Sequence, residues 1–291
     1  MKILLGNHTL LKPRGSEIWT WTIAEYLKIK GHDVTILTNE AGDFATEYLS
    51  DLEIVTDVTG RKFDLGIINH SRHLNDSGAI DVEKAILVSH GRLTDIERPP
   101  LKFHCPHRHV SVSNEVRSHW LNNNKIDSEV IVNPVRKDWF EIDMSKGPLN
   151  TVVCANHRHH APERMINAFV SRGIRFIRIE TGFSQSEIMR LFSIAQLVIG
   201  TGRYIYEAMA SGRRVIIADS KHGLGYVTEN NYNNRVWYNM TTRNPKRIVP
   251  NWDVLIEKCL KHNPGKMRHL AMSNHHVSKI VGKFFKILNE R

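Results

Sequence analysis

The chain has 291 residues, of which 41% are hydrophobic and 24% are charged, a composition typical of a globular protein that is too long for one small core. We therefore expect two domains. No apolar run reaches the roughly 18 residues that a membrane-spanning helix needs, and the N-terminus has the pattern of a strand, so we expect a soluble, cytoplasmic protein without a signal peptide.

Lysine and arginine outnumber aspartate and glutamate by 40 to 30, which gives a net charge of +10. Such an excess favours polyanionic partners, either nucleic acid or the anionic surface of a membrane. The alternative is a solvated basic surface whose only anion is a nucleotide phosphate. Three widely spaced cysteines, Cys105, Cys154 and Cys259, contain no C-x-x-C pair and predict neither a disulfide framework nor a zinc site.

The first part of the chain predicts a βαβ unit. Lys2–Leu5 is expected to form a strand, Ser16 to cap a helix that ends near Ile29, and Val34–Leu37 to form the next strand. No G-x-G-x-x-G follows the first strand, which argues against a dinucleotide-dependent dehydrogenase.

Further strands are predicted at 53–58, 65–69 and 85–89, and the last two are followed by His70 and His90. Open α/β sheets hold ligands at the carboxyl ends of their strands, so both histidines are candidate site residues. The loop 99–109 contains three histidines and Cys105, but no second set of ligands matches it, and we interpret it as a loop without a metal.

Residues 141–150 have the composition of a linker, and a second α/β segment follows. Its predicted strands are 151–155 and 175–179, and its predicted helices are 162–171, 185–195, 248–262 and 264–288.

The stretch 198–228 carries the most specific pattern. An apolar strand leads into Gly200-Thr201-Gly202-Arg203, a short helix containing Glu207 follows, and the next strand is 214–218. Glycines let a ligand approach the backbone, a helix N-terminus favours phosphate, and a carboxylate can accept hydrogen bonds from both hydroxyls of a ribose. An ordinary βα unit would show the same pattern, and the residues alone do not choose between the two.

Residues 206–216, Y-E-A-M-A-S-G-R-R-V-I, resemble the E-A-M-A-x-G-x-P-V-I signature of GT-B glycosyltransferases, particularly the retaining family 4. Weaker similarity to this family occurs at 31–34, 89–91, 110–117 and 130–140. The resemblance implies an α/β protein with two Rossmann-like domains facing a central cleft. Residues 1–145 would form the acceptor domain and 146–291 the nucleotide-sugar donor domain, with a C-terminal helix that crosses back to the N-terminal domain.

The same resemblance implies the site residues. Glu207 would bind the donor ribose, His90 would border the sugar site, and Arg158 would stabilise the leaving diphosphate, with His160 near the position of the family's lysine. We therefore expect His90 and Arg158 to be catalytic, and the donor to be bound by Gly15, Ser16, His160, Thr181, Gly182, Gly200, Thr201, Gly202, Arg203, Tyr204 and Glu207. The upstream acid of the family's glutamate pair is missing, and the Gly200–Arg203 turn takes its place.

The expected function is that of a retaining glycosyltransferase. Its substrate would be a nucleotide sugar with UDP, GDP or ADP, it would require no further cofactor or obligate protein partner, and its acceptor would be a glycan or a lipid-linked sugar. That acceptor would allow peripheral contact with the inner face of the membrane. Two alternatives stay open: a phage-type enzyme that glycosylates hydroxymethylated bases in duplex DNA, which suits the +10 charge, and a non-catalytic nucleic-acid- or sugar-binding protein.

Overall fold

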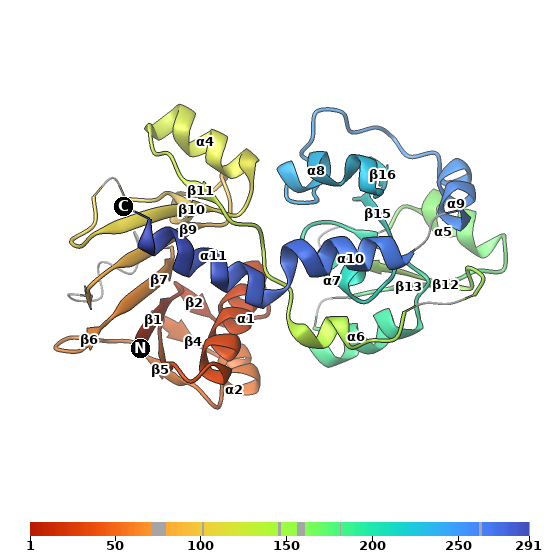
Figure 1. The fold of residues 1–291 in the computed structure, drawn as a ribbon. Coiled ribbons are helices and arrows are strands. Elements are labelled where there is room, and N and C mark those ends of the chain that lie inside the picture. Colours follow the sequence, from red (N-terminus) through yellow and green to blue (C-terminus); the bar gives the residue numbers. More distant parts are fainter. Residues whose placement is uncertain are drawn as a thin grey trace. The chain divides into compact units, whose positions relative to one another are not determined.

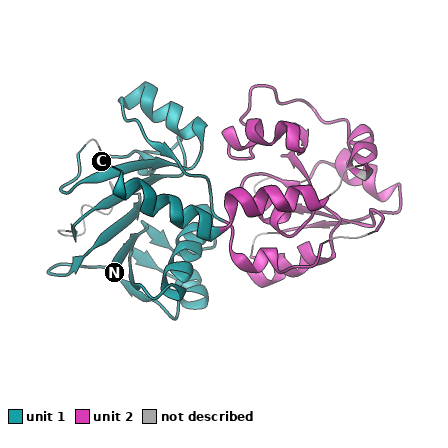
Figure 2. Cartoon of the chain, viewed as in Figure 1, with its two compact units in different colours: residues 1–134, 277–291 teal, residues 135–276 magenta. Residues whose placement is uncertain are grey.

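The computed structural model describes residues 1–70, 80–100, 102–144, 147–155, 161–180, 182–261 and 264–290. The chain divides into two compact units (Figure 2): unit 1 comprises residues 1–134 and 277–291, and unit 2 comprises residues 135–276. The sequence places this division at residue 145. The difference arises because Trp139 and Phe140, on the 3₁₀ helix η3 (Lys137–Phe140), are buried in the core of unit 2.

Unit 1 contains a parallel sheet with the strand order β11-β10-β9-β7-β1-β3-β5. Its strands are β1 (Lys2–Gly6), β3 (Asp33–Leu37), β5 (Glu53–Val55), β7 (Leu65–Asn69), β9 (Ala85–Ser89), β10 (His107–Ser111) and β11 (Glu129–Val130). Two short parallel pairs join β2 (Thr9–Leu10) to β4 (Glu40–Ala41) and β6 (Lys62–Phe63) to β8 (Asp81–Val82). The helices of this unit are α1 (Gly15–Ile29), α2 (Asp43–Tyr48), η2 (Asp95–Glu97), α4 (Asn114–Asn124) and α11 (Val277–Asn289).

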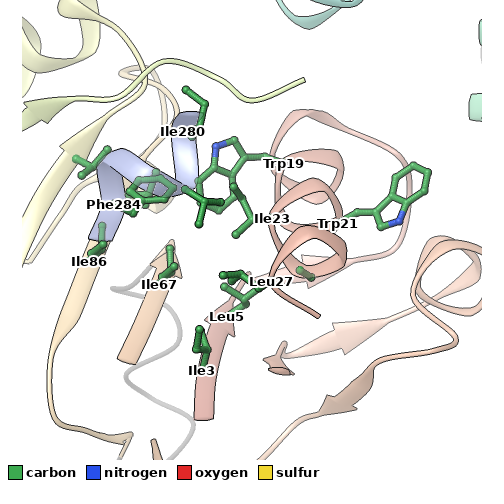
Figure 3. Packing of buried hydrophobic residues seen from close by; sticks show 14 of the residues in the cluster. Ile3, Leu5, Trp19, Trp21, Ile23, Leu27, Ile67, Ile86, Ile280 and Phe284 are labelled. Atoms are coloured by element: carbon green, nitrogen blue, oxygen red, sulfur yellow. The ribbon is translucent and has the colours of Figure 1, made fainter. Parts of the chain in front are cut away.

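Alternate residues of the central strands fill the two faces of this sheet. Ile3 and Leu5 of β1 point to the face covered by α1 and α11, whereas Leu4 points to a second apolar cluster on the other face. The two helices lie side by side (Figure 1), and the rings of Trp19 and Phe284 meet between them with their centroids 5.8 Å apart (Figure 3). Because both faces are covered, the central strands β7 and β9 are fully buried and almost wholly apolar.

Unit 2 contains a second sheet with the order β13-β12-β14-β15-β16, parallel except for β16. Its strands are β12 (Thr151–Ala155), β13 (Arg175–Arg178), β14 (Leu197–Gly200), β15 (Arg214–Ala218) and β16 (Gly223–Tyr226). Its helices are α5 (Glu163–Val170), α6 (Gln185–Ile194), α7 (Arg203–Ala210), α8 (Glu229–Trp237), α9 (Trp252–Leu260) and α10 (Pro264–His275).

Helices cover both faces of this sheet too. One cluster joins the strands to α6, α7 and α10 through residues such as Phe192, Met209 and Ala271. The other joins them to α5 and α9 through Phe169 and Trp252, whose ring centroids are 6.3 Å apart. Helix α7 is held at both of its ends, because β14 precedes it and β15 follows it in the same sheet.

The structure confirms the α/β class with parallel sheets and the return of the C-terminal helix to unit 1. The prediction of one helix over 264–288 is wrong, because α10 ends at His275 and α11 begins at Val277. His276 between them pairs with Val135 in an isolated parallel bridge. The loop expected over 99–109 gives way to strand from His107, where β10 pairs with β9. In the described part of the chain, none of the helices combines the length and the apolar character that crossing a membrane would take.

Candidate functional site

The turn between β14 and α7 depends on close backbone packing. A β-carbon at Gly200 would lie 2.7 Å from the carbonyl oxygen of Ala155, so only glycine allows β14 to end this close to β12. Gly202 has a φ of 63°, in the left-handed region that favours glycine, and its N–H donates to the carbonyl oxygen of Met240 at 2.8 Å. Because that N–H is already paired, it is not available to a ligand at this turn.

Glu207 is the buried acid of this turn, with a side chain only 3% exposed. Its Oε1 accepts a hydrogen bond from Nη1 of Arg203, one helical turn earlier. Its Oε2 is buried and has no hydrogen-bond partner among the residues that the structure describes. An unpaired buried carboxylate oxygen costs free energy of the order of 1–3 kcal/mol, which a ligand with a hydroxyl donor would recover.

Two further side chains hold Arg203 in place. Its Nη1 also donates to Oε1 of Gln185 at 3.3 Å, and its guanidinium carbon lies 5.3 Å from the ring centroid of Tyr204. Burial raises the pKa of the Tyr204 hydroxyl to about 12, so the ring stays neutral at physiological pH. Arg203 is thus a fixed cation beside a fixed acid.

Burial raises the pKa of Glu207 to about 7, although Arg203 favours the ionised form. Asp138 acts in the same direction as burial, and Arg136 opposes it. Arg136, just before η3, and Asp138, within it, form an ion pair with 2.6 Å between Nη2 and Oδ2. The carboxyl group is therefore close to its midpoint near neutral pH, where a ligand can shift its ionisation.

The structure brings most of the expected donor residues of unit 2 into one place. Gly200, Thr201, Gly202, Arg203, Tyr204 and Glu207 form the β14–α7 turn and the first turns of α7. Gly182, exposed and with a φ of 103°, precedes α6, whose first residue Gln185 contacts Arg203. Arg158, His160 and Thr181 lie outside the described residues.

Unit 1 has a polar cluster at the carboxyl ends of β1, β7 and β9, which are neighbours in the sheet. Asn7 follows β1, Asn69 ends β7 and is followed by His70, and His90 follows β9. All are buried except His90, which is partly exposed. The cluster therefore unites both of the strand-end histidines that the sequence singles out.

His90 is held from several directions. Its Nε2 lies 3.0 Å from Oδ1 of Asn69, its backbone N–H donates to Oε2 of Glu97 at 2.7 Å, and its ring meets the edge of Trp19 at 5.2 Å between centroids. Burial lowers the pKa of the imidazole to about 4, although Glu97 acts against this shift, so His90 is neutral at physiological pH.

Glu97, on η2, links the two histidines. Its Oε1 lies 3.6 Å from Nε2 of His70, whose Nδ1 lies 3.4 Å from the backbone nitrogen of His8. Burial opposes ionisation of Glu97, but the hydrogen bond from His70, the two imidazoles and the N–H of His90 together lower its pKa. His70 has a φ of 54°, an uncommon conformation for a residue other than glycine, of the kind that clusters at functional sites.

The start of α1 differs in detail from the prediction. The helix begins at Gly15 after Arg14, and Ser16 does not cap it; the hydroxyl of Ser16 instead donates to Oε2 of Glu17 at 2.9 Å. Burial raises the pKa of Glu17. A β-carbon on Gly15 would have no atom within 4 Å among the described residues, so the position is open.

Sequence reasoning missed Gln185, Glu97, Asn7 and Asn69. The two asparagines follow or end predicted strands, so the rule that selected His70 and His90 would also have found them. Glu97 lies in an irregular segment and Gln185 is the first residue of an ordinary capped helix. Neither of these two carries a signal in the sequence.

No family model matches the chain, and a search of curated proteins finds no match in sequence. Solved structures do match. A glycosyltransferase from Rickettsia africae ESF-5 is similar with a TM-score of 0.64 and 16% identity, over 98% of this chain and 97% of that one.

Two further structures match the chain over nearly its whole length. WaaG, a glycosyltransferase involved in lipopolysaccharide biosynthesis, gives a TM-score of 0.58 at 11% identity, over 99% of this chain and 100% of WaaG. The glycotransferase of kitacinnamycin gives 0.55 at 10% identity, over 98% of each chain. At such identities the likeness concerns the fold: the chain has the fold of the GT-B glycosyltransferases.

Proposed function

We propose that the chain is a retaining glycosyltransferase that moves a sugar from a nucleotide-sugar donor to a glycan or lipid-linked acceptor. The observation that carries the proposal is Oε2 of Glu207, a buried carboxylate oxygen without a donor in the described part of the chain. It lies on the first turns of α7, at the carboxyl edge of the sheet in unit 2, where open α/β sheets bind nucleotides.

A ribose supplies what Glu207 lacks. Its vicinal hydroxyls donate hydrogen bonds, and an ionised carboxylate accepts them more strongly than a neutral group does. Arg203, which already pairs with the other oxygen, keeps a positive charge beside the nucleotide and favours its diphosphate. In transfer, that charge and the expected contribution of Arg158 would stabilise the diphosphate as the bond to the sugar breaks.

Retention of the anomeric configuration is proposed from the similarity of residues 206–216 to the family 4 signature. Nuclear magnetic resonance of the product distinguishes retention from inversion directly. A product with the opposite anomeric configuration to the donor would contradict this part of the proposal and leave donor binding by Glu207 intact.

The experiment that tests donor binding is a thermal-shift panel of UDP-, GDP- and ADP-sugars with the purified protein, because a ligand that binds the folded state raises the melting temperature. We expect one nucleotide class to stabilise the wild type and to have little effect on Glu207→Ala. Glu229→Ala is the matched control, since Glu229 is exposed and forms an ion pair with the exposed Lys266. Equal shifts in Glu207→Ala and wild type would refute the role of Glu207.

The proposed acceptor rests on the role of a protein with a similar fold and on the net charge of the chain. WaaG acts in lipopolysaccharide biosynthesis. A net charge of +10 suits an acceptor carried on the anionic inner face of a membrane.

The same charge makes duplex DNA the second candidate acceptor. Titration of duplex DNA at rising salt separates the two candidates. Absence of binding at low salt would exclude the DNA-modifying alternative.

A further inference from the structure

A chain of hydrogen bonds connects α1 to the three strand ends of the polar cluster in unit 1. The hydroxyl of Thr20 donates to the carbonyl oxygen of Ser16 at 2.9 Å. Its oxygen also lies 3.0 Å from Nδ2 of Asn7 and 3.0 Å from Nδ2 of Asn69. Because the single hydroxyl hydrogen is used by Ser16, both asparagines must turn their NH₂ groups toward Thr20.

This requirement fixes which way the amide of Asn69 points. With its NH₂ on Thr20, its Oδ1 faces Nε2 of His90 at 3.0 Å. An amide oxygen can only accept, so the hydrogen between the two groups belongs to Nε2 of His90. A neutral imidazole carries one N–H, and Nδ1 is therefore a bare acceptor.

The surroundings of His90 agree with this tautomer. In the described part of the chain, Nδ1 makes no hydrogen bond, and the residue is partly exposed. The charged and titratable groups around it are Glu97 on η2 and His70 after β7, and Glu17 on α1 lies near His70. Burial lowers the pKa of His90 to about 4, so the second proton is absent at neutral pH.

We infer that Asn69 is a positioning residue which, through Thr20, sets the tautomer of His90 so that Nδ1 accepts a hydrogen bond from a sugar hydroxyl. The inference rests on the proposed function, and it adds which chemical group of a ligand the polar cluster of unit 1 would bind. A hydroxyl can donate to a bare nitrogen, whereas the oxygens of an ionised phosphate can only accept. The nearby carboxylate of Glu97, whose pKa is lowered, disfavours a phosphate as well. Unit 1 would therefore recognise an uncharged, hydroxyl-rich part of a ligand.

Nitrogen-15 resonance of the imidazoles in the full-length protein tests the tautomer without any ligand, with His90 assigned by the signal lost in His90→Gln. We expect Nε2 protonated and Nδ1 bare in the wild type at neutral pH. We expect Asn69→Ala to give a mixture of tautomers. Asn69→Asp should retain the Nε2–H, because a carboxylate is still an acceptor, and should raise the pKa of His90 by adding a negative charge.

A protonated Nδ1 in the wild type would overturn the inference, and so would an unchanged tautomer in folded Asn69→Ala. The wild-type spectrum needs no substitution, so the test survives if Asn69→Ala fails to fold. The result is independent of nucleotide-sugar binding, so failure of the proposed function and failure of the tautomer are separate outcomes.

Binding measurements on His90→Ala show whether the hydroxyl belongs to the donor sugar or to the acceptor. If it belongs to the donor sugar, His90→Ala should weaken binding of the nucleotide sugar by about tenfold, the effect of one lost hydrogen bond, and leave the free nucleotide unaffected. If it belongs to the acceptor, His90→Ala should raise the KM for the acceptor and leave donor binding unchanged. Equal loss of affinity for the nucleotide with and without its sugar would indicate phosphate contact and refute hydroxyl recognition, as would a variant unchanged in both.

Discussion

Burial of Glu207 on folding favours its protonated form, whereas a bound ligand would favour its ionised form. Its pKa is about 7 because burial outweighs Arg203, whereas hydroxyl donors favour the ionised carboxylate. Ligand binding should therefore release a proton, and nucleotide affinity should rise as the pH passes upward through about 7.

Calorimetric titration at several pH values, in buffers of different ionisation enthalpy, measures both the affinity and the released proton. In Glu207→Gln the affinity should be lower and independent of pH over this range. A pH dependence that survives in Glu207→Gln would assign the proton to another group.

Arg213 is a buried charged residue that hydrogen-bonds to backbone carbonyl groups. Its fully buried guanidinium donates through Nε to Phe192 O at 2.6 Å and through Nη2 to Asp143 O at 2.6 Å and Ser193 O at 3.2 Å. Phe192 and Ser193 lie at the end of α6, where the helix dipole favours a cation. Burial lowers the pKa of Arg213 to about 10, so the side chain stays charged at neutral pH.

Arg213→Met should lower the free energy of unfolding of unit 2 by about 1–3 kcal/mol, because it removes the hydrogen bonds that the guanidinium donates to three backbone carbonyls. Hydrogen exchange of unit 2 peptides in increasing urea measures the change. Arg190→Met, at an exposed position on the same helix, is the control and should change stability by less than about 0.5 kcal/mol. Equal effects of the two substitutions would contradict the role of the buried contacts.

Where a local motif is contiguous in the chain, the sequence predicted the place of its residues in the fold. Gly200 ends a strand and Glu207 lies on the short helix that follows, as expected. The hydrogen-bond partners of His90 come from β7 and η2, and only the fold brings them together. Gln185 likewise reaches Arg203 from another helix. Long-range polar partners of this kind leave no periodic pattern in a sequence.

At the scale of elements, the β14–α7 turn contains two glycines that are required for different reasons. A β-carbon on Gly200 would meet a backbone oxygen at 2.7 Å, whereas one on Gly202 would meet nothing within 4 Å in the described structure and would suffer only from its φ of 63°. Gly200→Ala should thus cost more, about 2–3 kcal/mol, than Gly202→Ala, about 1 kcal/mol.

Urea denaturation of unit 2, followed by hydrogen exchange, gives the two values under identical conditions. The reverse order of destabilisation would show that φ, and not the approach of β14 to β12, limits this turn. Both variants should keep the exchange pattern of unit 1.

Helix boundaries were predicted less well than helix existence. The 264–288 segment is helical in both its parts, as its apolar spacing indicates. The helix is interrupted at His276 because the backbone of this residue pairs with Val135. The predicted start of the helix at 248 is also wrong, because Ile248 exchanges backbone hydrogen bonds with Gly223 and α9 begins at Trp252. Tertiary pairing of the backbone overrides helix propensity at both places.

At the scale of the molecule, each unit has its own core. Phe284 belongs to the cluster of unit 1 and Phe192 to a cluster of unit 2, and both are buried. Phe284→Ala should destabilise unit 1 and Phe192→Ala unit 2, each by about 3–5 kcal/mol through the loss of a buried ring.

Hydrogen exchange with mass spectrometry, resolved by peptide, compares the two substitutions in one experiment. Each variant should lose protection in its own unit and retain it in the other. Loss of protection across both units in either variant would show that the chain unfolds as a single cooperative body.

The return of α11 to unit 1 has a consequence for synthesis on the ribosome. Domains generally fold as they emerge, the N-terminal one first. Here residues 135–276, which form unit 2, are all synthesised before residue 277. The sheet of unit 1 is not covered by Ile280 and Phe284 until these later residues have been added. The part of the protein that is made first is therefore the part that is finished last. Until then, the apolar surface around Trp19, Ile67 and Ile86 is open to chaperones and to other nascent chains.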